Sequence, residues 1–399
     1  MNAFKTIDQL NVTSQRILVR VDFNVPINAG VIGDTTRIAK TVPTLTELAG
    51  RGARVIVLSH LGRPNGQRSD DLSLQPVAKA LSDILGKPVP FATDCVGAEA
   101  EQIIGAMQDG DIVVMENLRF HPGEEKNDAA FARKLSSLAD VYVGDAFSCA
   151  HRAHASTEAI AHLMPSAAGR LMQAELEALT KALEIPQRPV AALVGGAKIS
   201  TKLAVLGHLV AKVNALIIGG AMANTFLHAQ GIDVGKSLCE HEMASQARDI
   251  LEKARAAGCD VVLPVDAVVA SAFATNVPTR TVDIDAVPAD MMILDIGPKS
   301  VAELTGRLGD LRTLLWNGPL GAFEVHPFDA GTTAVACAAA TRTQQGSLVT
   351  VAGGGDTVAA LAHAEVIDKF TYVSNAGGAF LEWLEGRDLP GVAILRTAT

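Results

Sequence analysis

The stretch PVAALVGGAKISTK, residues 189–202, holds the pattern that decides the fold. Its first residues, PVAALV, are all apolar, which predicts a buried β-strand. The strand runs directly into Gly195 and Gly196, and Lys198 and Lys202 follow a few residues later. A strand that is apolar at every position must be covered on both faces, as in a parallel sheet with helices on either side.

The same pattern of an apolar run followed by a polar or glycine-rich loop recurs along the whole chain. Longer amphipathic stretches lie between the runs, which predicts an α/β fold of parallel strands and crossover helices. The predicted strands are 16–21, 53–59, 111–116 and 140–144 in the first half, and 189–195, 214–219, 260–265, 313–317, 348–353 and 371–375 in the second.

Comparable groups of predicted strands flank residues 171–185, and 399 residues are many for one hydrophobic core. The stretch 171–185 favours a helix that ends before Pro186. We therefore predict two doubly wound, Rossmann-like parallel-sheet domains, residues 1–170 and 186–377, joined by this helix. An ordinary surface helix within one domain is the alternative.

Composition excludes several classes of function. Hydrophobic residues make up 48% of the chain, enough for large cores, and the net charge of −9 argues against a general nucleic-acid binder. The five cysteines show no C-x-x-C spacing, so we expect free thiols in a reducing compartment and no zinc site. The sequence has neither a secretory signal pattern nor an apolar run of the ~18 residues that span a bilayer. These features predict a cytoplasmic protein.

Polar residues follow each predicted strand of the first half. In open parallel sheets ligands bind beyond the carboxyl ends of the strands, and arginine forks bind carboxylate and phosphate groups. These strand ends therefore predict a site for a small ligand with several negative charges. The residues are Asp22 and Asn24, His60 and Arg63, Asn117 and Arg119, and Arg152 and His154, with Arg37 in the loop after the first strand.

Each of these residues also has a simpler explanation. Asp22 could cap a turn, His60 could be a structural histidine, and Arg119 could pair with Glu116. The convergence of several such residues at equivalent strand ends favours the ligand-binding interpretation.

The strand ends of the second half carry glycines instead, at 195–196, 219–220, 353–355 and 377–378. Such turns let backbone N–H groups approach phosphate oxygens. Asp356 and Thr357 fall at a predicted helix N-terminus, which favours anions, and Asp356 could bind Mg²⁺. Plain N-capping by Asp356 or Thr357 is the alternative.

The sequence contains no match to the phosphate-loop formula G-x-x-x-x-G-K-[ST]. A helix that begins near Ala197 would instead place Lys198 and Lys202 on one face, four residues apart. Two ammonium groups there could bind phosphates and stabilise phosphoryl transfer. A solvated lysine pair is the alternative.

Seven motifs taken together resemble the phosphoglycerate kinase family, and the resemblance covers essentially the whole chain. It implies transfer of a phosphoryl group between 1,3-bisphosphoglycerate and ADP, which gives 3-phosphoglycerate and ATP with Mg²⁺ as cofactor. It also implies a deep cleft between the two domains that closes at a helical hinge, and a C-terminal segment, residues 378–399, that packs back onto the first domain. The motifs are, in order, RVDFNVP, SHLGRP, ENLRF, DAF..AHRAHAST, GGAK.STK, WNGP.G.FE and GGGDT.

The resemblance also implies roles for single residues. In the first domain Asp22 and Asn24 would hydrogen-bond the hydroxyl and carboxylate end of the substrate, and Arg37 would also reach the transferred phosphoryl group. The other residues that would hold the anionic groups of the substrate are His60, Arg63, Arg119 and Arg152.

In the second domain the resemblance makes Lys198 the lysine that follows the phosphoryl group and Lys202 a catalytic ligand of the nucleotide phosphates. Gly377, a catalytic position, would offer a backbone N–H group together with Gly378, and Asp356 would be the Mg²⁺ ligand. The remaining nucleotide positions would be Gly220, Asn317, Glu324, Gly354, Gly355 and Thr357.

Three departures from the family pattern are visible. Ser148-Cys149 stands where the family usually has Gly-Thr, and Ala221 stands where a glycine is common near the adenine pocket. Asn375-Ala376 replaces a typical Thr-Gly, and a positive φ at Ala376 would strain the alanine by about 1 kcal/mol or more. None of these changes removes a charge, so we expect tuned activity and not lost activity.

Two other functions remain open from the residues alone. A nicotinamide-dependent dehydrogenase would need G-x-G-x-x-G after an early strand, whereas the first strand leads to VDFNVPINAG. A metabolite-binding protein without chemistry would have no need of Lys198. We expect a monomeric enzyme that acts on small molecules and binds neither nucleic acid nor membranes.

Overall fold

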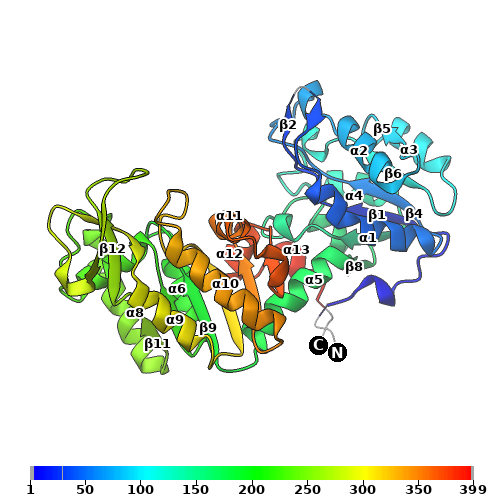
Figure 1. The fold of residues 1–399 in the computed structure, drawn as a ribbon. Helices are drawn as coiled ribbons and strands as arrows, with labels where there is room; N and C mark the ends of the chain where they lie inside the picture. The colour runs from blue at the N-terminus through cyan, green and yellow to red at the C-terminus, as the bar shows by residue number, and fades with distance from the viewer. Residues whose placement is uncertain (1–3, 29, 397–399) are drawn as a thin grey trace. The chain divides into compact units, whose positions relative to one another are not determined.

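The structure is a computed structural model, which describes residues 4–28 and 30–396 (Figure 1). The chain divides into two compact units. The first comprises the residues up to Leu176 together with the chain from Asp388 onward, and the second is Glu177–Arg387. Within the described ranges, no helix combines the length and the apolar composition needed to cross a membrane.

The first unit is built on a parallel sheet with the strand order β5-β6-β4-β1-β7-β8. The chain passes from β1 to the adjacent β4 and on to the edge strand β5, comes back to β6 between β5 and β4, and then crosses to β7 on the other side of β1. The strand order therefore reverses between β1 and β7, which is where such sheets bind ligands. The strands are β1 (Arg16–Arg20), β4 (Arg54–Leu58), β5 (Phe91–Ala92), β6 (Ile112–Met115), β7 (Val141–Gly144) and β8 (Ser166–Ala168), with a hairpin of β2 (Ile27–Asn28) and β3 (Val31–Ile32) beside them.

Alternation along β1 produces the two cores of this unit. Ile17 and Val19 belong to a buried cluster with residues of α1 and α2, whereas Leu18 belongs to a cluster with residues of α3 and α4. Side chains of a strand alternate between faces, so the apolar middle of β1, residues 17–19, serves both layers. The helices are α1 (Thr36–Gly50), α2 (Gln75–Leu85), α3 (Ala98–Gly105), α4 (Ala129–Ser136) and α13 (Pro390–Ala393).

The second unit repeats this plan with the strand order β11-β10-β9-β15-β16-β17, again parallel throughout. Its order reverses between β9 and β15. The predicted α/β class and the predicted parallel strands are thus confirmed in both halves of the chain. The strands are β9 (Val190–Val194), β10 (Ala215–Ile218), β11 (Asp260–Val262), β15 (Thr313–Asn317), β16 (Val349–Gly353) and β17 (Tyr372–Ser374).

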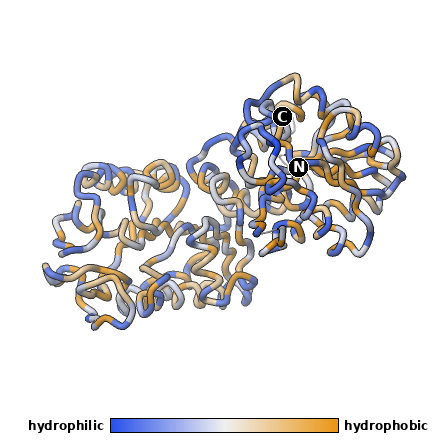
Figure 2. The backbone as a smooth tube through the Cα atoms, turned by 90° about the horizontal axis from the view of Figure 1, so that it is seen from above, coloured by the Kyte–Doolittle hydropathy of each residue, from blue (hydrophilic) through white to orange (hydrophobic). Residues whose placement is uncertain are grey.

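A small antiparallel sheet in the second unit was not anticipated from the sequence. It has the order β13-β12-β14 and its own small core, with Ala267, Val269 and Val287 buried. Hydrophobic segments of the chain occur throughout both units (Figure 2). The strands of this small sheet are β12 (Asp266–Ala270), β13 (Thr279–Asp283) and β14 (Met292–Ile296), and the α-helices of the unit are α6 (Leu203–Leu209), α7 (Ala221–Ala229), α8 (Ala244–Ala257), α9 (Pro298–Arg307), α10 (Ala330–Gln344), α11 (Gly355–His363) and α12 (Gly378–Leu384).

The boundary between the two units, at Leu176 and Glu177, falls inside a helix. Helix α5 (Arg170–Leu179) continues into a π-helical turn, η6 (Thr180–Glu184). Asp145 caps the start of α5, because its Oδ1 accepts hydrogen bonds from the backbone N–H groups of Leu171 (2.9 Å) and Met172 (3.0 Å). Burial raises the pKa of Asp145 to about 7.

The C-terminal return begins later than the predicted residue 378. Helix α12 belongs to the second unit, where it contacts α6 and where Phe380 is fully buried against Gly353. The return starts at Asp388, and it is held by hydrogen bonds from Gly391 N to Ala150 O (2.9 Å) and from Lys5 N to Leu395 O (3.0 Å). The apolar face of α12 keeps it with the second unit.

Candidate active site

In the first unit, Asp22 joins the loops that follow β1 and β7. Its Oδ2 accepts hydrogen bonds from Arg37 Nη1 (2.7 Å) and Ser148 Oγ (2.5 Å), and its Oδ1 accepts one from Asn24 N (3.0 Å). Asp22 therefore caps a turn, as the simpler explanation required, and also orients an arginine at the switch point. Asn24 Oδ1 accepts from Gly62 N (2.9 Å), which leaves its Nδ2 to donate to a ligand.

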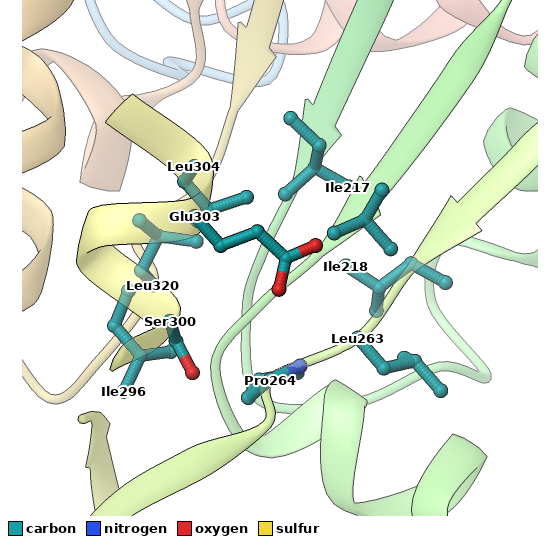
Figure 3. A pocket seen from close by; sticks show the side chains of 10 residues that line it. Ile217, Ile218, Leu263, Pro264, Ile296, Ser300, Glu303, Leu304 and Leu320 are labelled. Carbon is teal, nitrogen blue, oxygen red and sulfur yellow. The ribbon is translucent and has the colours of Figure 1, made fainter. Parts of the chain in front are cut away.

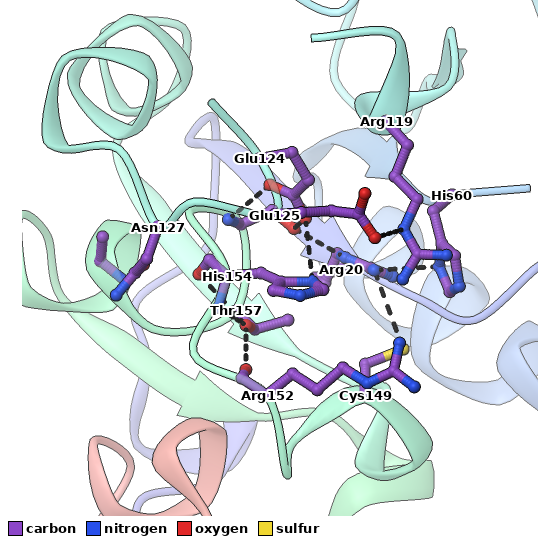
Figure 4. A network of polar contacts seen from close by, with 12 residues as sticks. Arg20, His60, Arg119, Glu124, Glu125, Asn127, Cys149, Arg152, His154 and Thr157 are labelled. Carbon is purple, nitrogen blue, oxygen red and sulfur yellow. Dashed lines mark hydrogen bonds and ion pairs between the residues drawn. The ribbon is translucent and has the colours of Figure 1, made fainter. Parts of the chain in front are cut away.

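The buried histidine of this site is held by Arg20, a residue that sequence reasoning missed. Arg20 Nη2 lies 3.1 Å from His60 Nδ1 (Figure 4). A guanidinium can only donate, so Nδ1 must accept and the proton of the neutral ring resides on Nε2. Burial and then Arg20 hold the pKa of His60 well below its usual value. His60 is thus a neutral hydrogen-bond donor.

Arg20 itself is fully buried and is connected to a buried acid through Ser156. Arg20 Nε donates to Ser156 Oγ (2.8 Å), and Ser156 donates from Oγ (2.6 Å) and from its backbone N–H (3.0 Å) to Glu124. The sequence signal was available, since a charged residue inside the apolar run RILVRV must find a buried partner. The identity of that partner could not be deduced from the sequence.

Arg119 is also buried, but its partner differs from the one considered from the sequence. Its Nη1 donates to Gly62 O (2.7 Å), and its Nε lies 3.2 Å from Glu125 Oε1, whereas Glu116 binds the backbone of Leu74. Nη2 of Arg119 makes no hydrogen bond to any described residue. Arg119 can therefore donate to a ligand without losing its own anchor.

The other predicted arginines of this unit are more accessible. Arg63 and Arg152 are exposed, and the side chain of Arg37 is 41% exposed. Arg63 makes no hydrogen bond or ion pair within residues 4–28 and 30–396, and Arg152 contacts the ring of His151 (3.1 Å). Because His60 and His154 are held neutral, with the pKa of His154 lowered to about 4 by burial, the positive charge of this region comes from arginine.

In the second unit, the loops after β9 and β15 touch backbone to backbone at the switch point. A Cβ on Gly195 would lie 1.9 Å from Pro319 O, and a Cβ on Gly318 would lie 2.2 Å from Gly195 O. Only glycine permits this approach. The pairing places Asn317 at the same edge of the sheet as Lys202.

The two lysines of the opening stretch do not share a helix face, so that prediction was wrong. Helix α6 begins at Leu203, and residues 197–202 form irregular turns, with Ile199 fully buried between the lysines. The burial of Ile199 anchors the loop and turns the two side chains apart. Lys198 is exposed, and its ammonium group makes no hydrogen bond or ion pair to the described residues.

Lys202 has the opposite character, because its ammonium group is committed to three oxygens. Nζ donates to Gly195 O (2.8 Å), Asn317 O (3.1 Å) and Asn317 Oδ1 (2.5 Å). An ammonium group has three protons to donate, so a ligand phosphate can bind Lys202 only by replacing one of these contacts. Lys202 therefore also stabilises the junction of the two loops.

The glycine turn after β16 is fastened by Asn317 and Thr357. Asn317 Nδ2 donates to Gly353 O (2.7 Å), and Thr357 Oγ1 accepts from Gly318 N (2.7 Å). The N-cap of α11 is Gly354, without a side-chain cap, so neither Asp356 nor Thr357 caps the helix. Asp356 is exposed in the first turn and makes no hydrogen bond or ion pair to the described residues.

A cavity of about 350 Å³ opens beside these turns, a size that suits a nucleoside. Its walls are mainly apolar, and Gly220, Ala221, Glu324 and Asp356 are among its lining residues. Asp295, also in the lining, accepts from Gly331 N (2.7 Å), and burial raises its pKa to about 7. Gly220, Glu324 and Asp356, predicted separately, are thus brought to one cavity.

A second hollow beneath this region is too small to bind a ligand. It measures about 10 Å³, at or below the room that one water molecule needs, and side chains of β10, α9 and the loop after β11 surround it (Figure 3). Figure 3 shows Glu303 among mainly apolar neighbours such as Ile217 and Leu263. The Glu303 carboxylate is paired with Arg307 Nε (2.9 Å).

The last glycine turn lies after β17. Gly377 has a φ of 54° and precedes α12, whereas Ala376 is not among the residues with positive φ. The strain considered for Ala376 therefore does not arise. Gly355 is the first residue of α11, and a Cβ there would meet nothing within 4 Å.

The comparisons with known proteins agree with this architecture. The family model described as phosphoglycerate kinase matches residues 7–387. The chain belongs to the phosphoglycerate kinase family. The phosphoglycerate kinases of Rhodopseudomonas palustris and Methylobacterium radiotolerans are 59% and 60% identical to it, over 98% and 99% of both chains.

Solved structures give the same result. The phosphoglycerate kinase of Coxiella burnetii matches with a TM-score of 0.92 and 42% identity, and that of Pyrococcus horikoshii OT3 with 0.80 and 28%; each match covers 98% of both chains. Membership of this family excludes the dehydrogenase and the non-catalytic binder that the residues alone left open.

The departures from the family pattern can now be located. Ser148 donates to Asp22, and Cys149 Sγ lies 3.8 Å from Arg20 Nη2, so both contact the buried polar network of the first unit. Burial raises the pKa of the Cys149 thiol, which keeps it neutral. Ala221 lines the cavity of the second unit.

Proposed function

We propose that this chain transfers a phosphoryl group between 1,3-bisphosphoglycerate and ADP by direct in-line displacement, giving 3-phosphoglycerate and ATP. The observation that carries the proposal is its membership of the phosphoglycerate kinase family over residues 7–387. The test is a coupled assay of ATP formation from ADP and 1,3-bisphosphoglycerate, with and without Mg²⁺. Absence of ATP formation by a correctly folded protein would overturn it.

The proposed phosphoryl transfer does not require a catalytic proton donor. In the direction of ATP synthesis, the bond between phosphorus and the C1 carboxyl oxygen breaks, and a bond between phosphorus and a β-phosphate oxygen of ADP forms. The leaving group departs as a carboxylate, whose conjugate acid has a pKa of about 4, so no general acid is required. The protein must instead position the two ligands and balance charge on the transferred group.

We assign the glycerate side to the first unit. Arg37, Arg63, Arg119 and Arg152 would hold the carboxylate and phosphate groups. His60 would donate from Nε2, and Asp22 and Asn24 would bind the hydroxyl and carboxylate end. Asn24 supports this role because its Oδ1 is already occupied by Gly62 N, so its free Nδ2 must donate.

We assign the nucleotide to the second unit, with the nucleoside in the 350 Å³ cavity beside Gly220 and Glu324. Its phosphates would extend toward the N-terminus of α11, where Gly354, Gly355 and Thr357 lie and free N–H groups favour anions. Gly377 would add a backbone N–H group. Transfer then requires the two units to bring their ligands together during turnover, which excludes water.

We assign to Lys198 the role of following the phosphoryl group during its transfer and stabilising its negative charge. Lys198 is exposed and uncommitted, whereas Lys202 and Asn317 are hydrogen-bonded to each other and to backbone. A side chain that must follow a moving phosphoryl group cannot be fixed by ground-state contacts. This division of labour explains the presence of two lysines.

Asp356 fits a Mg²⁺ ligand, since it is an exposed carboxylate without a partner among the described residues, beside the proposed phosphate site. Mg²⁺ characteristically uses one or two carboxylates together with phosphate oxygens and waters. Bound there, the ion would neutralise charge on the nucleotide phosphates. We also propose that the protein is a monomer. A cytoplasmic location is proposed as well, and the free thiols of all five cysteines support it.

Asp356→Asn is expected to raise the Mg²⁺ concentration needed for half-maximal activity by about tenfold, which corresponds to ~1.4 kcal/mol. The carboxamide keeps an oxygen ligand but loses the charge. Initial rates across a Mg²⁺ titration measure the shift, with the exposed Asp368→Asn as a matched control. An unchanged titration curve would remove Asp356 from the metal site.

The nucleotide side should respond to pH through Lys202. Burial lowers the pKa of Lys202 to about 8, while Asp356 opposes the shift. The folded protein therefore loses this charge as pH rises through about 8, and we expect the KM for ADP to rise there. The unfolded chain keeps its proton up to the ordinary value of 10.5. Burial of the charged ammonium group therefore destabilises the folded protein below about pH 8, and this penalty disappears, so that stability rises, as pH increases from about 8 to 10.5.

Lys202→Arg provides the comparison, because a guanidinium stays charged over this whole range. Its KM for ADP should be flatter between about pH 7 and 9.5 than that of the native chain, measured as initial rates at saturating 1,3-bisphosphoglycerate. Parallel pH profiles in the two proteins would show that Lys202 does not titrate in this range.

A further inference from the structure

The loop that carries Lys198 is held by a residue from a distant part of the chain. Ser200 N donates to Glu240 Oε2 (3.0 Å), and Ser200 Oγ donates to Glu240 Oε1 (2.6 Å). Both carboxylate oxygens thus bind one serine. Glu240 precedes the short 3₁₀ turn η7 (His241–Met243), and it has no part in the proposed chemistry.

Glu240 is itself anchored to the helix that borders the nucleotide cavity. Its backbone N–H donates to Thr225 Oγ1 (3.1 Å), and Thr225 is a buried residue of α7. Two residues earlier, Leu238 O accepts from Asn224 Nδ2 (3.1 Å), and both Leu238 and Asn224 line the cavity. The segment 238–240 therefore contacts the cavity wall on one side and the lysine loop on the other.

The loop has few other restraints near Lys198. Buried Ile199 anchors one side, and Thr201 Oγ1 donates to Lys198 O (2.9 Å), which is a contact within the loop. Because residues 197–202 are not helical, no helical hydrogen bonds hold the backbone of Lys198. Lys202 ties the end of the loop to Gly195 and Asn317, and the two hydrogen bonds from Ser200 to Glu240 connect the exposed part next to Lys198 to the rest of the unit.

The surroundings of Glu240 favour its charged form. Burial would raise its pKa, but the hydrogen bonds from Ser200 and the positive charge of Lys198 outweigh it, so the pKa lies below its ordinary value. The other charged group near the segment is Glu242, which is exposed. Glu240 therefore accepts the hydrogen bonds from Ser200 as a carboxylate.

We propose that Glu240 is a positioning residue for phosphoryl transfer, which holds Ser200 so that the ammonium group of Lys198 is presented to the migrating phosphoryl group. The inference rests on the proposed function. It predicts that Glu240 contributes to turnover through Lys198 alone. Glu240 would touch neither substrate.

The first experiment compares Glu240→Ala, Glu240→Gln and the control Glu242→Ala. We expect Glu240→Ala to lower kcat by about tenfold, the scale of one or two charge-assisted hydrogen bonds, with the KM values for both substrates changed less than about twofold. Glu240→Gln keeps one acceptor oxygen and should lie between Glu240→Ala and the native chain. Glu242→Ala should be indistinguishable from native.

The decisive experiment repeats Glu240→Ala in a Lys198→Ala background. If Glu240 acts through Lys198, the double variant should turn over no more slowly than Lys198→Ala, although the two single losses would multiply if they were independent. Thermal unfolding of each variant checks the fold, and ADP affinity measured by calorimetry should stay native. Multiplying losses, weakened ADP binding or a native kcat in Glu240→Ala would overturn the inference.

These outcomes separate the two proposals. A native protein without ATP-forming activity would remove the proposed function itself. An active native protein that is sensitive to Lys198→Ala but unaffected by Glu240→Ala would remove only the role of Glu240.

Discussion

Lys198→Ala is expected to lower kcat by about 10²-fold or more, while the fold and the affinity for ADP are retained. The ammonium group of Lys198 makes no hydrogen bond or ion pair to the described residues, so its removal costs the folded protein little. Its free charge is available to the transferred phosphoryl group, and loss of one transition-state contact of this kind typically costs about 10²–10³ in rate.

The measurement is the steady-state rate of ATP formation at saturating substrates. Lys253→Ala, which removes another exposed lysine from α8, is the matched control and should keep native turnover. Lys198→Arg separates charge from geometry, since the bulkier fork keeps the charge but cannot follow the same path. Near-native kcat in Lys198→Ala would remove the catalytic role assigned to this lysine.

Arg37→Ala is expected to lower kcat/KM for 1,3-bisphosphoglycerate by at least about 10²-fold and to leave the dissociation constant of ADP unchanged. Arg37 lies in the first turn of α1, where a positive charge is unfavourable for the helix, so stability does not explain its presence. Its pair with Asp22 at 2.7 Å orients both groups toward the same edge of the sheet.

Calorimetry with ADP and initial rates with both substrates test this prediction on the full chain. Lys40→Ala, an exposed lysine one turn further along α1, controls for the loss of a positive charge. A weaker affinity for ADP in Arg37→Ala would contradict the assignment of the two ligands to different units. An equal loss of activity in Lys40→Ala would mean that the general field matters more than the contact.

The arginines and the neutral histidines of the first unit have a common physical basis. Burial near Arg20 and Arg119 makes a charged imidazolium costly, so His60 can bind a ligand only as a neutral donor. The positive charge of the site then resides on guanidinium groups, which do not titrate near neutral pH. The pH dependence of the enzyme should therefore arise mainly from the nucleotide side, through Lys202.

The pattern of apolar residues along the sequence predicted the strands correctly where a short stretch determines its own structure. The strands were predictable because a run such as VAALV can be buried only in a covered sheet, and parallel strands bring their carboxyl ends to one edge. The polar groups at those ends, such as Asp22 after β1 and Asp356 after β16, could therefore be located from the order of residues alone. The antiparallel sheet β13-β12-β14 was missed, because its strand β13 is exposed and lacks that apolar signal.

Contacts between distant residues could not be deduced in this way. The sequence does not say that Arg119 pairs with Glu125 rather than Glu116, or that buried Ile199 prevents a helix from carrying both lysines on one face. Nor does it say that Lys202 is committed to Asn317, 115 residues away, while Lys198 stays free.

The sequence by itself therefore determined the two parallel-sheet units, the family, and the residue types gathered at each sheet edge, because these depend on local periodicity and on the carboxyl ends of strands. Only the tertiary structure decided which of those side chains are hydrogen-bonded within the protein, such as Lys202, and which remain available to a ligand, such as Lys198. The physical reason is that a hydrogen bond depends on positions fixed by the packing of the whole unit, and that packing is not encoded in any one stretch of the chain.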